Sequence, residues 1–265
     1  MYAFNYHRPD SLEAAAAALA AAADGQVLAG GQTLIPTLKQ RLASPSDVVD
    51  LSSITSLRAI RRDGDPIMIG AMARHADVAS SSVVRGAIPA LAALADSIGD
   101  PQVRNCGTIG GSIANADPAA DYPAAVVGLG ASVRTNRRTI SGDDFFTGLF
   151  ETALDDGEIV VSVNFPIPRR AAYAKFPNPA SRYAIVGVMV AETDGGVRVA
   201  VTGAGDSVFR VGAMEAALGD NFSADAIRDI SVPQDALNED IHASAEYRAH
   251  LVGVMAGRAV AAAAG

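Results

Sequence analysis

The chain has 265 residues, 49% of them hydrophobic, which is enough to form two or three modest globular lobes. Its formal net charge is −8 and no basic run exceeds two residues, as at Arg61-Arg62, which disfavours nucleic-acid binding. No signal-peptide pattern and no apolar run of about 18 residues are visible, so we expect a cytoplasmic chain without a membrane span.

The first 55 residues have the pattern of a small unit of strands and helices. An alanine-rich run has high helix propensity; Asp10 is its expected N-cap, Glu13 completes a capping box, and Gly25 ends it. Pro36 is tolerable in a second helix because it falls in the first turn. The elements predicted for this unit are helices at 11–24 and 33–42 and strands at 26–30 and 47–51.

The stretch from residue 56 to residue 168 mixes short strands with helices. Two apolar runs around Asp63-Gly64-Asp65 indicate a hairpin. An apolar pattern at helical spacing ends at Gly99, and Pro166 ends the last strand. The elements predicted here are a hairpin at 57–73, one helix at 82–99, a short helix feeding a strand within 123–135, and a strand at 158–168.

Residues 169–265 form a third predicted lobe, which begins after a proline-rich run. A hairpin is expected around Asp194-Gly195-Gly196, and helices follow it. The elements predicted in this lobe are the hairpin at 183–205 and helices at 211–219, 223–230 and 244–263. Because strands and helices are segregated along the chain, the sequence predicts an α+β fold rather than a doubly wound sheet.

Two glycine loops are the main functional signal. They are LAGGQTL at 28–34 and GTIGGSIAN at 107–115, and a helix candidate follows each. Glycine allows backbone N–H groups to turn toward a ligand, and consecutive N–H groups at the start of a helix suit a phosphate. A single Gly-Gly pair is more often an ordinary turn. From the pattern alone, ordinary turns and a pair of loops gripping a dinucleotide both remain open.

Other nucleotide-binding signatures are missing from the sequence. It contains neither a G-x-G-x-x-G motif after a strand nor the G-x-x-x-x-G-K-[ST] motif. A Rossmann dinucleotide fold and a P-loop are therefore disfavoured.

The two glycine loops lie in longer segments that point to a known family. Residues 29–54 and 100–125 closely resemble the FAD-binding subunit of molybdenum hydroxylases, which include xanthine dehydrogenases, aldehyde oxidases and aerobic carbon monoxide dehydrogenases. The medium subunit of the carbon monoxide dehydrogenase type is the best match, and the resemblance runs nearly the whole length. It implies an FAD domain of the p-cresol-methylhydroxylase type, with two α+β lobes at 1–55 and 56–168, followed by a C-terminal α+β lobe at 169–265.

The resemblance also implies which residues contact FAD. Asp121 matches an aspartate that holds the cofactor, and Tyr183 matches a tyrosine near the isoalloxazine. The full set of expected FAD contacts is Ala29, Gly30, Gly31, Gln32, Thr33, Leu34, Ile35, Thr108, Ile109, Gly110, Gly111, Ser112, Asp121, Val160, Lys175 and Tyr183.

The sequence departs from the family pattern at a few of these positions. Gln32 stands where some subunits have His, and Ser112 where many have Asn or Asp. Arg182-Tyr183 replaces the paired acidic residues of animal xanthine dehydrogenases, which weakens any expectation of their NAD chemistry. The FAD site itself rests mainly on backbone contacts.

The implied function is electron transfer within a complex. A partner large subunit with the molybdenum cofactor oxidises the substrate, and a small subunit with two [2Fe-2S] clusters passes the electrons to FAD, in a dimer of heterotrimers. The lone thiol of Cys106 agrees with this, since a cluster needs about four ligands. Oxygen, a quinone and NAD are all open as the final acceptor. The alternatives are a stand-alone FAD-dependent oxidase and an assembly subunit that has lost its flavin.

We expect no catalytic or metal-binding residue in this chain. Cys106 is interpreted as a small packing residue, and Asp117 as a turn cap or as half of a carboxylate pair with Asp121. The histidines show no metal-ligand spacing and are interpreted as surface or capping residues; they are His7, His75, His242 and His250.

Overall fold

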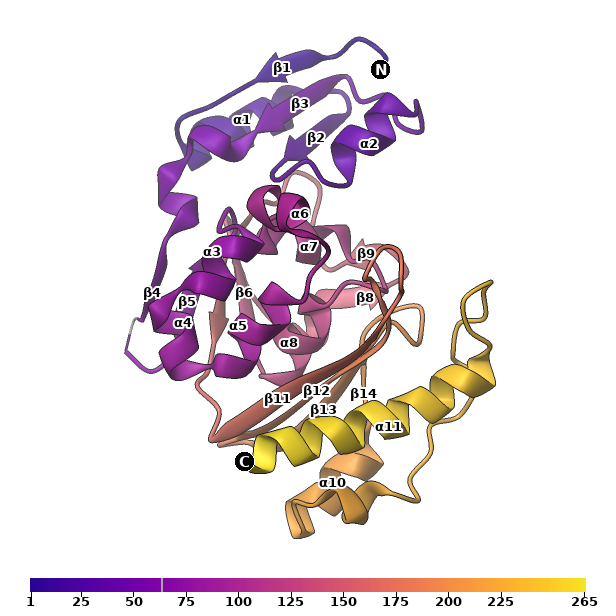
Figure 1. Cartoon of the computed structure of the whole chain (residues 1–265). Helices are drawn as coiled ribbons and strands as arrows, with labels where there is room; N and C mark the ends of the chain where they lie inside the picture. Colours follow the sequence, from indigo (N-terminus) through magenta and orange to yellow (C-terminus); the bar gives the residue numbers. More distant parts are fainter. Residues whose placement is uncertain (63) are drawn as a thin grey trace.

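Three larger β-sheets with their helices follow one another along the chain (Figure 1), and a further sheet has two strands. The structure, a computed structural model, describes residues 1–62 and 64–265, so the predicted turn residue Asp63 lies outside the described residues. The α+β fold expected from the sequence is confirmed, whereas the predicted lobe boundaries stay predictions. Within the described ranges, no helix combines the length and hydrophobicity needed to cross a membrane.

The first sheet is parallel because helical connections join its strands. Its strand order is β1-β3-β2. The elements are β1 (Asn5–His7), α1 (Leu12–Ala21), β2 (Gly25–Leu28), α2 (Leu34–Lys39) and β3 (Asp47–Asp50), followed by 3₁₀ turns η1 (Leu51–Ser53) and η2 (Thr55–Arg58). The prediction that Asp10 caps α1 is wrong: the Ser11 hydroxyl accepts from the Ala14 N–H at 3.2 Å, one residue further on.

The second sheet is antiparallel, in the order β4-β5-β10-β6-β7, and helices cover it. Its strands are β4 (Ile60–Arg62), β5 (Ile67–Gly70), β6 (Ser132–Thr135), β7 (Thr139–Ser141) and β10 (Val160–Phe165), with a small hairpin of β8 (Phe146–Gly148) and β9 (Glu151–Thr152). The helices are α3 (His75–Ser80), α4 (Ser82–Ala87), α5 (Pro89–Asp96), α6 (Pro101–Cys106), α7 (Ile109–Asn115), α8 (Tyr122–Gly128) and α9 (Gly142–Phe145).

The single helix predicted at 82–99 is wrong, because the structure has two helices there. Ile88 separates α4 from α5 with φ −137° and ψ 72°, outside the helical region. A proline disfavours the helical conformation of the residue before it, and Pro89 is itself well placed in the first turn of α5. The apolar periodicity runs through both helices, but the proline decides where the helix breaks.

The third sheet is antiparallel, in the order β11-β12-β13-β14, and lies between α5 and α8 on one face and the last helix on the other (Figure 1). Its elements are β11 (Arg170–Pro177), β12 (Ala184–Thr193), β13 (Gly196–Thr202), β14 (Phe209–Arg210), α10 (Gly212–Asp220), η3 (Ala224–Ile227) and α11 (Ala245–Ala264). The helix predicted at 223–230 is only the 3₁₀ turn η3, and β11 was not predicted.

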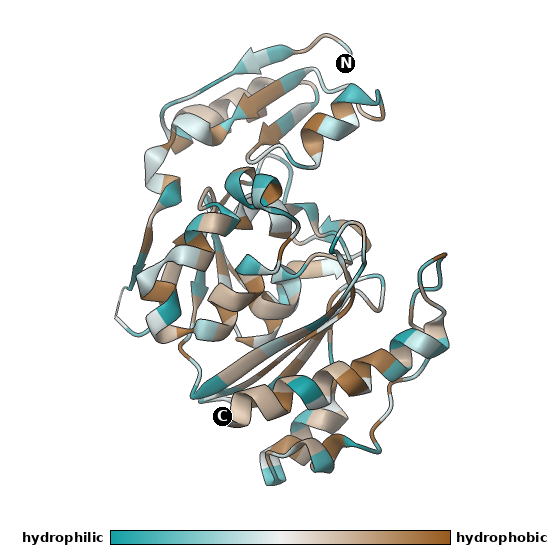
Figure 2. Cartoon of the chain, in the orientation of Figure 1, coloured by the Kyte–Doolittle hydropathy of each residue, from teal (hydrophilic) through white to brown (hydrophobic). Residues whose placement is uncertain are grey.

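Strand β12 is buried on both faces. Val188 and Val190 belong to the core against α11, whereas Met189 and Ala191 belong to the core of the second sheet. Successive side chains of a strand point to opposite faces, so one strand serves two hydrophobic cores. Figure 2 colours each residue by its hydropathy and shows hydrophobic residues in the strands of the third sheet.

Candidate functional site

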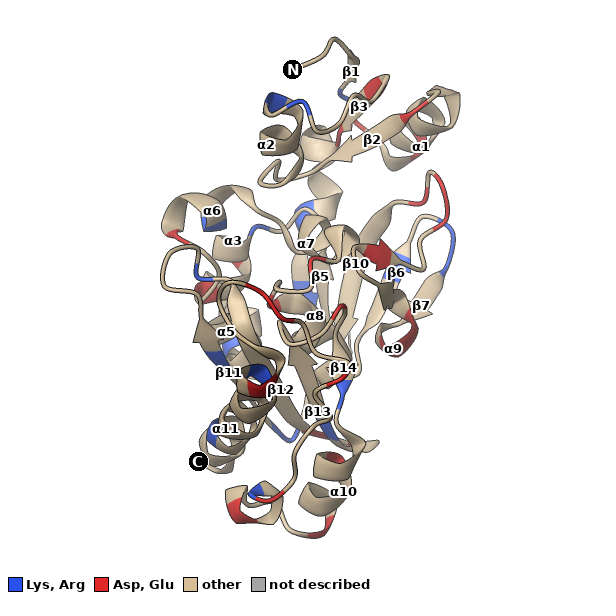
Figure 3. Cartoon of the chain, turned by 90° about the vertical axis from the view of Figure 1, so that its right-hand side faces the viewer, with Lys and Arg blue, Asp and Glu red and all other residues tan. Residues whose placement is uncertain are grey.

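A cleft of about 670 Å³ lies between the first two sheets and extends to the loop that joins β11 to β12. Its volume is in the range of small-molecule and cofactor sites. Both glycine loops line it, the first after β2 and the second at the start of α7. Figure 3 shows basic and acidic residues interspersed along the ribbon.

The first glycine loop presents free backbone donors. The five N–H groups from Gly30 to Leu34 make no hydrogen bond to any residue that the structure describes. Gly31 has φ +71°, a conformation that glycine adopts without strain. Consecutive N–H groups of this kind form a concavity suited to an anion. This loop therefore has the geometry of a phosphate-binding loop.

The second glycine loop differs, because the N–H groups of its two paired glycines are already used within the protein. The N–H of Gly110 donates to the Ala71 carbonyl at 2.9 Å. The N–H of Gly111 donates to the hydroxyl of Thr108, which caps α7, at 3.2 Å. The expectation that both loops offer a run of free amides to a ligand therefore holds for the first loop alone; in the second, the Thr108 N–H makes no hydrogen bond to a described residue.

Small residues in these loops are required by close packing of the chain against itself. A Cβ on Gly30 would lie 2.3 Å from the Cys106 carbonyl oxygen, and one on Gly110 would lie 2.5 Å from the Ala71 Cβ. The two loops therefore touch each other and the end of β5. Packing between the loops therefore requires small side chains here, in addition to the ligand approach expected from the sequence.

Asp121 is 4% exposed and held by two side chains of β11. The Tyr173 hydroxyl donates to one carboxylate oxygen at 2.6 Å, and the Lys175 ammonium lies 2.9 Å from the same oxygen. Burial raises the pKa of the Asp121 carboxyl, and the Lys175 charge opposes that shift. Because the carboxylate is occupied in this way, the alternative of an Asp117–Asp121 acid/base pair loses support.

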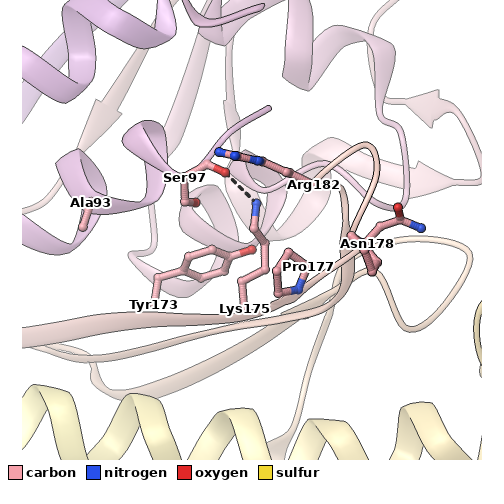
Figure 4. A pocket seen from close by; sticks show the side chains of 8 residues that line it. Ala93, Ser97, Tyr173, Lys175, Pro177, Asn178 and Arg182 are labelled. Carbon is pink, nitrogen blue, oxygen red and sulfur yellow. Dashed lines mark hydrogen bonds between the residues drawn. The ribbon is translucent and has the colours of Figure 1, made fainter. Parts of the chain in front are cut away.

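Lys175 faces a second, smaller cavity of about 490 Å³ rather than the main cleft. Figure 4 shows its ammonium donating to the Ser97 carbonyl, at 3.0 Å, with Tyr173 beside it. From the sequence alone, Lys175 reads as a solvated charge. In the structure its side chain is 7% exposed. This cavity is lined by Ala93, Ser97, Tyr173, Lys175, Pro177, Asn178, Pro179 and Arg182.

Tyr183 stands at the mouth of the cleft, with 48% of its surface exposed. Partial burial raises the pKa of its hydroxyl, and the carboxylates of Asp117 and Asp121 add to the shift. Its neighbour Arg182 has φ +62°, which is uncommon for a residue with a side chain. Asp117 accepts from the Ala119 N–H at 2.9 Å, the turn-capping contact expected from the sequence.

Most residues expected to contact FAD line the one cleft. Ile109 is fully buried in the core of the second sheet, and neither it nor Ile35 or Lys175 lines the cleft. The expected contacts that do line it are Ala29, Gly30, Gly31, Gln32, Thr33, Leu34, Thr108, Gly110, Gly111, Ser112, Asp121, Val160 and Tyr183.

The sequence reasoning missed His75 as a cleft residue. The interpretation of His75 as a surface or capping residue is wrong, because it is 5% exposed and its ring lies 5.4 Å from that of Tyr122. Burial lowers its pKa to about 4, helped by the charge of Arg104. No sequence signal marks this, since the His75 ring lies against Gly107 and Tyr122, which are distant in sequence.

Glu158 is a second cleft residue that the sequence reasoning missed. Its carboxylate accepts from the Thr135 hydroxyl at 2.6 Å and from the Arg138 guanidinium at 3.0 Å. Burial works against ionisation, but these hydrogen bonds outweigh it and lower the pKa of Glu158 to about 2. The ion pair fixes the loop after β9, which forms one wall of the cleft.

Comparison with known proteins identifies close relatives. A family model described as "FAD binding domain in molybdopterin dehydrogenase" matches residues 2–168. The carbon monoxide dehydrogenase medium chain of Hydrogenophaga pseudoflava is 35% identical over 98% of this chain and 96% of its own length. The nicotine 6-hydroxylase medium subunit of Paenarthrobacter nicotinovorans is 36% identical over 94% and 93%. A chain of the H. pseudoflava carbon monoxide dehydrogenase structure that lacks the Mo-pyranopterin moiety matches with a TM-score of 0.89 at 37% identity, covering 98% of this chain and 96% of its own.

Proposed function

This chain belongs to the family of FAD-binding subunits of molybdopterin dehydrogenases, and on that premise we propose that its cleft holds one non-covalent FAD between the two glycine loops. Its cofactor is FAD, and it is an oxidoreductase subunit of a molybdenum-containing dehydrogenase. FAD supplies the redox chemistry, since it can accept electrons singly and pass on two, while the protein binds and orients it.

The observation that carries the proposal is the run of unpartnered N–H groups in the first loop. The groups from Gly30 to Leu34 border the cleft and would hold the two phosphates of FAD. No side chain hinders approach at Gly30 and Gly31, and a Cβ on Gly30 would collide with the second loop. The residues present therefore fit a dinucleotide that needs close backbone contact.

The other cleft residues would hold the remaining parts of FAD. We assign direct contacts to the thirteen expected residues that line the cleft and supporting roles to the other three. Lys175 supports the site by pairing with Asp121, and Ile109 by anchoring α7 in the core. We propose that Tyr183 lies beside the isoalloxazine, because it is the exposed aromatic side chain that lines the cleft.

The proposed electron path needs partner subunits. With one cysteine, the chain cannot assemble an iron–sulfur cluster of its own. The proposed donor is a small subunit with [2Fe-2S] clusters, reduced by a large subunit that carries the molybdenum cofactor, in a cytoplasmic dimer of heterotrimers. Relatives named as medium chains or medium subunits support a complex of several subunits. These relatives do not favour the alternative of a stand-alone FAD-dependent oxidase.

Absorbance spectroscopy of the purified full chain tests the cofactor. We expect a flavin spectrum whose colour passes into the supernatant after acid precipitation, since the proposed binding is non-covalent. Colour that stays in the pellet would contradict non-covalent binding, and a chain that stays colourless after incubation with FAD would contradict the proposed function.

Reconstitution with the partner subunits tests the electron path. The isolated, FAD-loaded chain should show no turnover with aldehydes, purines or carbon monoxide. Adding the cluster and molybdenum subunits should produce substrate-driven bleaching of the flavin. Rapid reduction of the lone chain by such a substrate would favour the stand-alone oxidase instead.

A further inference from the structure

We infer that Thr202, in the third sheet, is a positioning residue for the FAD site, because it holds the 117–121 segment that carries Asp117 and Asp121 to the cleft. This inference rests on the proposed function. Thr202 is fully buried and does not line the cleft, so it has no contact of its own with a ligand there.

The 117–121 segment lies along the end of the third sheet. The Gly203 N–H, just after β13, donates to the Pro118 carbonyl at 2.7 Å. The Ala184 N–H, at the start of β12, donates to the Ala119 carbonyl at 3.2 Å. Two neighbouring strands therefore bind the backbone of a segment that belongs to the second lobe.

The Thr202 hydroxyl makes the remaining contacts with this backbone. Its oxygen lies 2.6 Å from the Ala120 carbonyl oxygen and 3.0 Å from that of Pro118. Within the described part of the chain, no other donor reaches the Ala120 carbonyl. Removing the hydroxyl would leave this acceptor without its partner in a residue that is 8% exposed, which is costly for a buried polar group.

The entry to the segment is strained, which explains why it needs such support. Ala116 has φ +47° and ψ 39°, the left-handed conformation that residues with a Cβ disfavour. Strained residues persist only where the surrounding contacts fix them. The contacts from Thr202 and Gly203 follow within a few residues and supply that restraint.

The third sheet also holds the side chain at the far end of the segment. Tyr173 and Lys175 of β11 both bind the Asp121 carboxylate. Strand β11 thus fixes the Asp121 side chain, while β12 and the end of β13 fix the backbone at residues 118–120. A change at Thr202 should release the backbone, move Asp117 and Asp121 relative to the first glycine loop, and weaken FAD binding.

The test compares Thr202→Val, which is nearly isosteric and lacks the hydroxyl, with Thr202→Ser, which keeps it. The control is Val188→Ala, which makes a hole in the core beneath α11 without touching the 117–121 segment. FAD affinity is measured by flavin fluorescence on the full chain, and thermal stability by circular dichroism. We expect Thr202→Val to weaken FAD binding about tenfold and Thr202→Ser to restore it to within about twofold.

Hydrogen exchange supplies a second measurement that does not depend on FAD. In the chain without flavin, exchange at the Ala119 and Ala120 amides should accelerate about tenfold in Thr202→Val, and stay near the wild-type rate in Val188→Ala. The inference is overturned if Thr202→Val leaves both FAD affinity and this exchange unchanged. It is also overturned if Val188→Ala weakens FAD equally. A wild-type chain that binds no FAD would instead refute the proposed function.

Discussion

Replacing Glu158 with glutamine removes the negative charge that fixes one wall of the cleft. The Glu158 side chain is fully buried, and its Oε2 lies 3.0 Å from Nη2 of Arg138. The Arg138 side chain is 46% exposed. The contacts lower the pKa of Glu158 from its ordinary value of 4.5 to about 2. At about 1.36 kcal/mol per pKa unit, this difference corresponds to about 3 kcal/mol of stability. Solvent screening of the exposed Arg138 reduces the expected loss to about 2 kcal/mol at pH 7.

The sign of the pH dependence follows from the lowered pKa. The folded protein binds the Glu158 proton less tightly than the unfolded chain, so the stabilisation is fully present above about pH 4.5 and is lost as the pH falls toward 2. The stability difference between wild type and Glu158→Gln should therefore be largest at pH 7 and shrink progressively below pH 4.5.

Urea unfolding at pH 7, 4 and 3 measures this difference, followed by far-ultraviolet circular dichroism because the chain has no tryptophan. The control is Asp156→Asn, an exposed acidic residue of the same loop, which should change stability by less than about 0.5 kcal/mol. A difference between wild type and Glu158→Gln that stays constant from pH 7 to pH 3 would refute the role assigned to the charge.

Three further predictions concern the cleft and the end of α7 beside it. Gly31→Ala should lose about 1–2 kcal/mol of unfolding free energy in urea and weaken FAD binding in a fluorescence titration, because φ is +71° and the new Cβ would lie 2.9 Å from Ile35. Ala116→Gly should gain about 0.5–1 kcal/mol, since relief of the left-handed strain exceeds the entropy cost of glycine; a loss would show that Ala116 is not strained. Tyr183→Ala should slow substrate-driven flavin bleaching in the assembled complex more than it weakens FAD binding, and equal effects on both would place the ring elsewhere.

The sequence supports the α+β class and the cleft because the motifs that carry them are local. Most residues of the runs at 29–35 and 108–112 line the cleft within a few positions of one another, so a linear pattern can identify them. The helix break at Ile88 has an equally local cause, because Pro89 follows it directly. The choice of Ser11 over Asp10 as N-cap was not decidable from residue type, since both side chains are good caps.

The parts that could not be predicted depend on contacts between distant segments. Lys175 looks solvated in sequence because its partner Asp121 is 54 positions away. The Ile109 and Gly110 amides of the second glycine loop donate to Ala73 and Ala71, just after β5, which no motif indicates. The requirement for glycine at position 110 comes from Ala71, so a valine there would disturb the packed start of α7 rather than only a ligand loop.

Strand β12 has a consequence for how such proteins can be cut and recombined. The family model ends at residue 168, yet the core of the matched region includes Met189 and Ala191 from beyond that point. A fragment ending at 168 would expose the surface of α8 around Gly128, where Met189 lies so close that a Cβ would come within 2.7 Å of it. The region matched by the family model is therefore shorter than the region that packs as one core. A chimera that exchanges the C-terminal third between relatives must keep the β12 side chains that pack toward α8, such as Met189 and Ala191. The β12 side chains that pack toward α11 are exchanged together with α11 and can therefore differ.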